Sequence, residues 1–515
     1  MFTTKKTVPA MFSISIKWLL NSLVAVCLYC FVSPEAQGQI VQTERYEIPV
    51  TSRDDEFSII PASVNGLYLN RVIEDARETY LQLIKLDTAF KENWSGVLPI
   101  PKNYLIASRK VSGNNLYVLM RYVNYSNNNL LLYIINNTDG SFMRHPIKSY
   151  IPFLQTEFEI TDRAVLIGGY YGTTPFVLHY DTRYNRSKVL PGLFNEIGEL
   201  NQIKTNADNS FDVLIAARNR ARQKTIWIKS YTSAGDLIEN RALKPEGSNH
   251  LLFGREVRPD ESAQIVAGVF GNRMKEFSKG IFVTSLSTEG ETTRYYNFSD
   301  MENFFKFMKA KREQRVKSRI QRKKIHGKKI RMMYRFMLHE LVPYQDNYIL
   351  LGEAFYPKYQ NANNNFHIGG YNFGSPYGAS RIFAGYQYTH AVVMCFDKQG
   401  NMLWDNSFEI NDLRSFTLEQ FVKLEVHEDK IAMMYLFDGQ IRTKVIKNNQ
   451  VLEGKTSDGI KTLRQSDFVK NNAVEQGKLD YWYGDKLYAC GVQEIVNHGI
   501  GKRKVFFINK VTFKD

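Results

Sequence analysis

Short apolar runs, broken by turn-forming residues, dominate the chain after residue 40. The runs are rich in Val, Ile, Leu, Tyr and Phe, and Gly, Asn and Asp separate them. Runs of this length and composition, bounded by such residues, are typical of β-strands. The pattern therefore predicts an all-β protein.

One hairpin signature recurs along the chain: a tight turn of Asn, Asp or Gly, followed at once by an apolar strand. These residues suit such turns because they accept positive φ or bond their own backbone. The turns lie at Gly66, Asn114, Asp162, Asn209, Asp260, Asp346, Asp429 and Asp485. The spacings are 48, 48, 47, 51, 86, 83 and 56 residues, and each of the two long steps contains an insert of roughly 30 residues. This period indicates a repeat architecture.

A second turn recurs within the units, for example at Thr232–Gly235 and Asp397–Gly400. It joins a third strand to a fourth, so each unit is expected to be a four-stranded antiparallel meander. A radial array of such units is a β-propeller. We predict eight blades, with seven as the alternative if one weak unit is not a full blade. Two stacked β domains are a further alternative, although no Pro- or Gly-rich linker separates two halves.

The two ends of the repeat region predict ring closure. The last unit has only three strands, near Leu479–Tyr483, Lys486–Val496 and Arg503–Phe513. The segment Gln42–Val50 is a strand with no unit of its own. Pairing it with the last unit would complete a blade and remove an exposed sheet edge.

At the level of architecture the chain resembles known β-propeller proteins. The segment Val393–Trp404 is similar to a blade of the quinoprotein-type propellers. After residue 38 the chain has only Trp94, Trp227, Trp404 and Trp482, too few for the repeated Trp motif of that family. The resemblance implies a shape and no activity.

The N-terminus predicts an export signal. Lys5, Lys6 and Lys17 precede an apolar run from Trp18 to Val32, and Ala36 and Gly38 supply the small residues that signal peptidase requires. We therefore expect a signal peptide at 1–38 and a single propeller domain at 39–515, located in the periplasm, at the cell surface or in the medium. An uncleaved membrane anchor is the alternative, but the run is shorter than the roughly 20 residues of a spanning helix. No second run of that kind follows residue 38.

Positive charge is concentrated in one insert. The chain carries a formal net charge of +15, and residues 306–331 hold thirteen Lys or Arg against one acid, Glu313. The first insert, 299–332, predicts a basic helix with a capping box at Ser299–Glu302 and a stop at Gly327. Phe304, Met308, Val316 and Ile320 give it a narrow apolar stripe that would rest on the propeller.

The second insert, 356–386, is rich in Asn, Gly, Tyr and Phe and predicts a long loop. Alternating turns place both inserts on the face that carries the long connections, where function concentrates in rigid scaffolds. We predict binding residues there: Lys323, Lys324, Lys328, Lys329, Arg331, Tyr371 and Phe373.

The expected partner is anionic: a glycan, a lipid head group or an acidic protein. Nucleic acid is disfavoured because residues 309–331 contain no aromatic residue for base stacking. The sequence thus favours an exported, non-catalytic binding or scaffold propeller. The basic segment could instead be a solvated face that only confers solubility.

No motif for catalysis, cofactor or metal binding is present, and we expect neither a cofactor nor a metal. His339-Glu340 lacks the second His of a zinc protease motif, so His339 and His390 are expected to be core residues. Asn206–Asp212 alternates like calcium ligands but falls in a hairpin turn. The alternative function is an enzyme on an anionic glycan, with acid and base groups such as Glu353 and His367.

Overall fold

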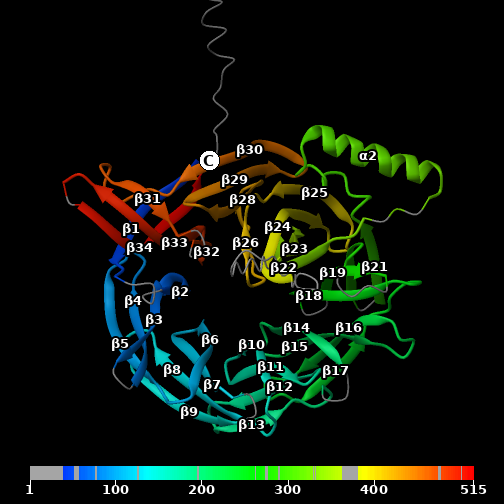
Figure 1. The fold of residues 1–515 in the computed structure, drawn as a ribbon. Helices are drawn as coiled ribbons and strands as arrows, with labels where there is room; N and C mark the ends of the chain where they lie inside the picture. The colour runs from blue at the N-terminus through cyan, green and yellow to red at the C-terminus, as the bar shows by residue number, and fades with distance from the viewer. Residues whose placement is uncertain are drawn as a thin grey trace, which may run out of the picture.

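Eight antiparallel sheets are arranged in a ring in the computed structural model, and the chain visits them in order (Figure 1). In the first six blades along the chain, the first strand lies nearest the centre of the ring (Figure 1). The protein is therefore an eight-bladed β-propeller, as the repeat period predicts, rather than a seven-bladed ring or two stacked domains. The structure describes residues 39–514 except 52–56, 76–77, 125–126, 194–196, 261–262, 273–276, 288–289, 329, 331, 362–380, 474–476 and 500. The expected signal peptide lies outside the described residues.

Blades 1 to 4 each consist of four strands in simple up-and-down order. Blade 1 comprises β2 (Ser58–Pro61), β3 (Leu67–Asp75), β4 (Glu78–Leu86) and β5 (Glu92–Ile100), with the short 3-10 helix η1 (Ser63–Asn65) in its first turn. Blade 2 comprises β6 (Tyr104–Ser112), β7 (Asn115–Tyr122), β8 (Asn129–Asn136) and β9 (Phe142–Lys148). Blade 3 comprises β10 (Leu154–Ile160), β11 (Ala164–Tyr171), β12 (Thr174–Asp181) and β13 (Arg186–Val189). Blade 4 comprises β14 (Gly198–Thr205), β15 (Phe211–Arg218), β16 (Lys224–Tyr231) and β17 (Leu237–Ala242).

Blades 5 to 8 follow the same plan with additions. Blade 5 comprises β18 (His250–Asp260), β19 (Ala263–Gly271), β20 (Gly280–Ser287) and β21 (Gly290–Asn297). Blade 6 comprises β22 (Arg335–Tyr344), β23 (Asn347–Asn361), β24 (Arg381–Phe396) and β25 (Met402–Glu409), and β26 (Arg414–Ser415) pairs with β24. Blade 7 comprises β27 (Lys423–His427), β28 (Lys430–Phe437), β29 (Gln440–Lys447) and β30 (Gln450–Gly459). Blade 8 comprises β32 (Lys478–Tyr483), β33 (Lys486–Asn497), β34 (Gly501–Lys514) and β1 (Gln39–Pro49), and β31 (Phe468–Asn472) also pairs with β33.

The core is divided into eight apolar clusters, one at each junction between neighbouring blades. For example, Leu81 of blade 1 and Val118 of blade 2 share one cluster, and Leu69 of blade 1 and Phe506 of blade 8 share another. The middle strands are covered on both sides by neighbouring blades. This explains why strands such as β11 are continuous apolar runs rather than alternating ones.

The eight predicted hairpin turns each join the first and second strands of a blade. One face of the propeller therefore carries these tight turns, and the longer connections lie on the opposite face. The predicted closure is also confirmed: β1 pairs with β34 from Gln39–Lys514 to Pro49–Val505, so the first and last described strands complete one sheet. Figure 1 shows blue β1 beside red β34.

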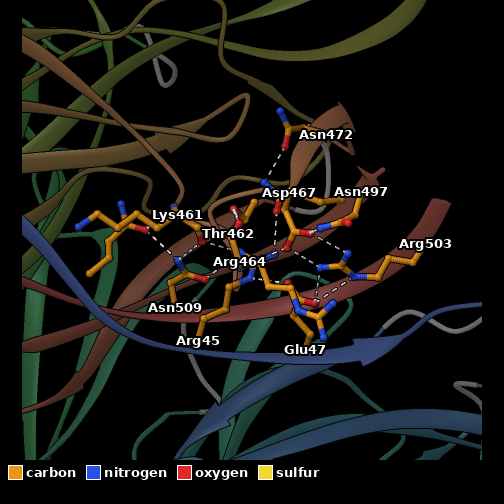
Figure 2. Close-up of polar contacts among 12 residues, drawn as sticks. Arg45, Glu47, Lys461, Thr462, Arg464, Asp467, Asn472, Asn497, Arg503 and Asn509 are labelled. Atoms are coloured by element: carbon orange, nitrogen blue, oxygen red, sulfur yellow. Dashed lines mark hydrogen bonds and ion pairs between the residues drawn. The ribbon is translucent and has the colours of Figure 1, made fainter. Parts of the chain in front are cut away.

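A polar network covers this closure (Figure 2). The Arg45 guanidinium donates to Glu47 at 2.7 Å and to Asn509 Oδ1 at 3.0 Å. The Arg503 guanidinium, on β34, donates to Asp467 Oδ2 at 2.7 Å and to Glu47 Oε2 at 3.2 Å. The bond from Arg503 strongly lowers the pKa of the Asp467 carboxyl, whose side chain is fully buried. The network thus ties the joint between β1 and β34 to the segment before β31.

The helix in the first insert begins later than the sequence predicts. Within the described residues the one α-helix is α2 (Ala310–Ile325), and the predicted capping box is wrong. The backbone amides of Glu302 and Asn303 instead donate to the Asp405 carboxylate of β25 at 3.0 and 2.9 Å. This contact competes with a helical start, and buried Phe304 anchors the same turn in the core.

The apolar stripe of the insert rests on the propeller as expected. Ile320 is buried, and Val316 and Met308 pack beside it in the cluster between blades 5 and 6. The predicted stop is also confirmed, because α2 ends at Ile325 and Gly327 follows with φ +60°.

The second insert is shorter than the predicted loop 356–386. Strands β23 and β24 extend into it as a hairpin, with Asn361 paired to Arg381. The sequence pattern concealed this extension because Gly and Asn interrupt the apolar residues. Tyr371, Phe373 and His367 lie outside the described residues.

Cys395 and Cys490 are both free and buried, in blades 6 and 8 respectively. Burial raises the pKa of each thiol to about 12. We expect both thiols to be unreactive towards a thiol reagent in the native protein and to react fully in denaturant, since the thiolate is the nucleophile. An intact mass two units lower, restored by reductant, would contradict this expectation.

Candidate functional site

A large groove opens on the face that carries the long connections, between blade 4, blade 5 and α2. Its volume is about 1110 Å³. The wall from blade 4 is the turn between β15 and β16, and the wall from blade 5 includes Asn272 and Lys279 beside β19 and β20. The third wall is the C-terminal end of α2 and the segment that follows. The groove is larger than most small-molecule pockets, so it can accept an extended ligand.

The lining of the groove is strongly basic. Six cationic side chains face one acidic side chain, Asp300; the six are Arg218, Arg222, Lys224, Lys279, Lys324 and Lys328. Two of the six are paired: Lys224 with Glu199 at 2.8 Å and Lys324 with Asp300 at 2.6 Å. In the part of the chain that the structure describes, the other four make no ion pair. The groove therefore attracts anions.

The blade 4 turn is held rigidly. The Asn219 amide donates to the Gln223 carbonyl at 2.8 Å, and the Arg222 amide donates to the Asn219 carbonyl at 2.9 Å. Arg222 has φ +60°, a conformation that is uncommon for a residue with a side chain. The Gln223 side chain also donates to the Gly247 carbonyl at 2.8 Å, which ties the turn to the crossover before blade 5. The turn thus presents Arg218 and Arg222 from a fixed backbone.

The end of α2 supplies the opposite wall. The Lys328 amide donates to the Lys323 carbonyl at 2.9 Å, which closes the last turn of the helix. This closure directs Lys328 and Lys324 into the groove. Both side chains are exposed; Lys324 pairs with Asp300, whereas Lys328 makes no ion pair within the described residues and is available to a ligand.

The structure brings together only part of the predicted site. Lys324 and Lys328 line the groove, whereas Lys323 does not. Lys329, Arg331, Tyr371 and Phe373 lie outside the described residues.

Sequence reasoning missed four cations of the groove: Arg218, Arg222, Lys224 and Lys279. A signal for three of them was present. Residues 218–224, Arg-Asn-Arg-Ala-Arg-Gln-Lys, place four cations in a seven-residue hairpin. A charge count over the whole chain concealed this cluster because acids elsewhere balance it.

The expected catalytic acid is not accessible. The Glu353 side chain is fully buried and accepts hydrogen bonds from the Val422 amide at 2.7 Å and from His339 Nε2 at 2.9 Å. Glu353 therefore joins blades 6 and 7 rather than facing a ligand. His339 is a satisfied core residue, as predicted.

The other sequence-level candidates are also structural. His390 is fully buried and stacks on Phe307 at 3.6 Å between ring centroids, and burial lowers its pKa to about 3. Asn206 and Asp212 bond each other across a hairpin turn at 2.8 Å. Among the described residues no group of three or more His, Cys, Asp or Glu is placed to hold a metal ion.

No protein-family model and no curated protein sequence matches this chain. Among solved structures, the chain is similar to the polysaccharide lyase Uly1, with 9% identity over 92% of this chain and 100% of that one and a TM-score of 0.40. It is also similar to the β-propeller domain of the Trilobed protease from Pyrococcus furiosus, with 9% identity over 78% and 98% of the two chains and a TM-score of 0.35. It is similar as well to prolyl oligopeptidase B from Galerina marginata, with 8% identity over 86% of this chain and 55% of that one and a TM-score of 0.39. At these values the similarity assigns neither an activity nor a ligand to this chain.

Over the described residues, no helix is both long and apolar enough to cross a bilayer.

Proposed function

We propose that this protein is an exported binding propeller that holds an anionic ligand in the basic groove without acting on it chemically. One observation carries the proposal: Arg218, Arg222, Lys279 and Lys328 converge on one groove from three separate segments and make no ion pair within the described residues. Unpaired cations gathered in this way repel one another, and an anion relieves that repulsion. The ligand therefore carries phosphate, sulfate or carboxylate groups.

The cations of the groove surround one cavity, whereas other cations of the same insert lie on an open surface. Its cations come from two blades and the helix end, whereas the helix also carries Lys311, Arg315 and Arg319 four residues apart on one exposed face outside the groove. The two sets contain three or more cations each. Neutralising each set in turn and measuring anion binding distinguishes a binding site from a charged surface that only confers solubility.

The triple variant Arg222→Gln/Lys279→Gln/Lys328→Gln is expected to bind anionic ligands roughly 100-fold more weakly, since each cation contributes about 1 kcal/mol near an anionic surface. The melting temperature should change little, because Arg222 and Lys328 are exposed and the half-buried Lys279 makes no ion pair within the described residues. Binding of an acidic polysaccharide, polyglutamate and anionic vesicles, measured by titration at two salt concentrations, provides the test. The three probes separate the three expected partner classes.

The matched control is Lys311→Gln/Arg315→Gln/Arg319→Gln, which removes the same charge from the outer face of α2. It should lose less than about threefold in affinity, since these charges lie outside the groove and are screened by salt. Equal losses in both variants would show that only net charge matters. Unchanged binding of all three probes to the groove variant would overturn the proposed function.

A further inference from the structure

A second cavity adjoins the basic groove and differs from it in chemistry. Its volume is about 570 Å³. Its walls are the first strands of blades 4, 5 and 6 and the extended hairpin of β23 and β24. The lining is mainly apolar and includes Phe253, Val269, Phe336, Met337, Phe355 and Pro357. The cavity therefore lies at the inner wall of the ring, beside the groove.

Three polar side chains of this cavity have partners of their own. Glu199 pairs with Lys224, and the Ser278 hydroxyl donates to the Tyr334 carbonyl at 2.9 Å. The Arg335 guanidinium lies over the Phe277 ring at 5.0 Å. Beyond the hydroxyls of Tyr359 and Tyr386 few polar groups face a ligand there, so most amides or hydroxyls of a bound peptide or sugar would lack a protein partner, which is costly. An aliphatic chain carries no such groups, so it fits the lining.

The groove and the cavity meet at two points. Leu252 lines both of them. The ion pair between Lys224 of the groove and Glu199 of the cavity, at 2.8 Å, crosses the junction and leaves it close to neutral. One molecule can therefore place a charged end among the cations and an apolar part against the inner wall.

The rim of the cavity is open and apolar. Tyr359 is 54% exposed, Phe383 is 37% exposed and Leu418 is 45% exposed. Tyr359 and Phe383 contact each other with ring centroids 5.9 Å apart, and Phe383 also contacts Tyr386 at 5.0 Å. Exposed large apolar groups gathered at a cavity mouth mark a binding surface more often than a plain protein surface. The rim thus provides an entry path for an apolar chain.

We infer that the ligand of the basic groove is an anionic lipid bound as a single molecule, with its charged head among Arg218, Arg222, Lys279 and Lys328 and its aliphatic chain in the apolar cavity. The inference rests on the proposed function, because the head requires the groove. To that function it adds the chemical class of the ligand, a lipid. Charge complementarity favours the anionic head, and the mainly apolar lining of the cavity favours the aliphatic chain.

The test is calorimetric titration of the full protein with alkyl phosphates below their micelle concentrations. Dodecyl phosphate is expected to bind at least about 100-fold more tightly than hexyl phosphate, since each buried methylene adds to the affinity. Dodecyl maltoside, with the same chain and a neutral head, should bind far more weakly than dodecyl phosphate. Inorganic phosphate should bind weakly but measurably.

Two variants test whether the aliphatic chain of the ligand binds in the apolar cavity. Leu418→Glu places a carboxylate at the rim, and Phe383→Ser removes a rim ring; each is expected to reduce dodecyl phosphate affinity about tenfold and to leave inorganic phosphate binding unchanged. The matched control is Leu403→Glu on β25, at a residue that is 50% exposed and lines neither cavity. This control should bind dodecyl phosphate as the parent does.

The outcomes separate the two proposals. Equal affinity for hexyl, dodecyl and inorganic phosphate would overturn the lipid inference and leave the anion-binding function in place. Equal affinity for dodecyl maltoside and dodecyl phosphate would also overturn it, since the head would then contribute nothing. Failure of every anion to bind, acidic polymers included, would overturn both.

Discussion

Deletion of Arg503–Asp515 is expected to abolish the cooperative unfolding of this protein. The deletion removes nearly all of β34, which pairs with β1 on one side and with β33 on the other. Blade 8 would lose its third strand and the ring would open, exposing two sheet edges that promote aggregation. Circular dichroism melting and size-exclusion chromatography provide the measurement. A soluble, cooperatively melting truncation would contradict closure through this strand.

A point variant tests the same joint with a smaller perturbation. Asp467→Asn should lower the free energy of unfolding by about 2 kcal/mol, less than for a fully buried pair because Arg503 remains 23% exposed. The control is Lys502→Ala, which breaks an exposed pair with Glu494 on the neighbouring strand and should change stability by less than about 0.5 kcal/mol. A loss in the control equal to that in Asp467→Asn would contradict a special role for the network.

The contribution of Asp467 to the free energy of unfolding should decrease at acidic pH. The pKa of Asp467 is lower in the folded protein than in the unfolded chain, because Arg503 donates to its carboxylate. Its contribution to stability is therefore complete above the unfolded pKa of about 4 and is lost as the pH falls towards the folded value. The Asp467→Asn variant should lack this acid sensitivity.

The variant Glu256→Gln is expected to be more stable than the parent at alkaline pH. Glu256 is 2% exposed, and burial followed by the charge of Asp212 raises its pKa well above the usual range. A raised pKa means that the stabilising contribution is complete below the unfolded pKa and is lost as the pH rises through the folded pKa. Glutamine keeps the shape and carries no charge at any pH.

Urea unfolding between pH 5 and pH 9 measures this effect. Above the unfolded pKa of about 4.3 the parent should lose up to about 1.4 kcal/mol of stability per pH unit for as long as Glu256 stays protonated in the folded protein, and the variant should lack that slope. Glu340→Gln is the control, because Glu340 is 63% exposed and makes only a long pair with Lys204 at 3.4 Å. Parallel pH profiles of the parent and Glu256→Gln would contradict a raised pKa of Glu256 in the folded protein.

The blades could be predicted because their signals are local. Each hairpin turn needs residues that accept its backbone geometry, so Asn114 or Asp429 marks a turn without reference to the rest of the chain. The same argument covers closure, because three strands at one end and one strand at the other suffice to infer a shared blade. The helix start failed for a non-local reason: Asp405, about 100 residues away in the sequence, takes the amides that the capping box would satisfy.

The basic groove could be predicted only in part, because it is assembled by the ring. Lys324 and Lys328 stand out in a basic segment, but Lys279 is a single cation beside a turn and gives no signal in the sequence. Its role follows from the position of blade 5 between blade 4 and α2. Glu353 shows the opposite error, since an acid near an insert suggested chemistry and the fold buries it against blade 7.

The pairing of β1 with β34 also sets the order in which the protein can assemble. Synthesis begins at the N-terminus, so β1 is made before every blade, yet Gln39 meets Lys514 only when the last strand is complete. Until then β1 is an unpaired edge, and the ring is an open array of blades. Contacts between such distant residues form slowly, because the intervening chain must be ordered first. Closure of the ring by β1 and β34 is therefore expected to be a late step of folding.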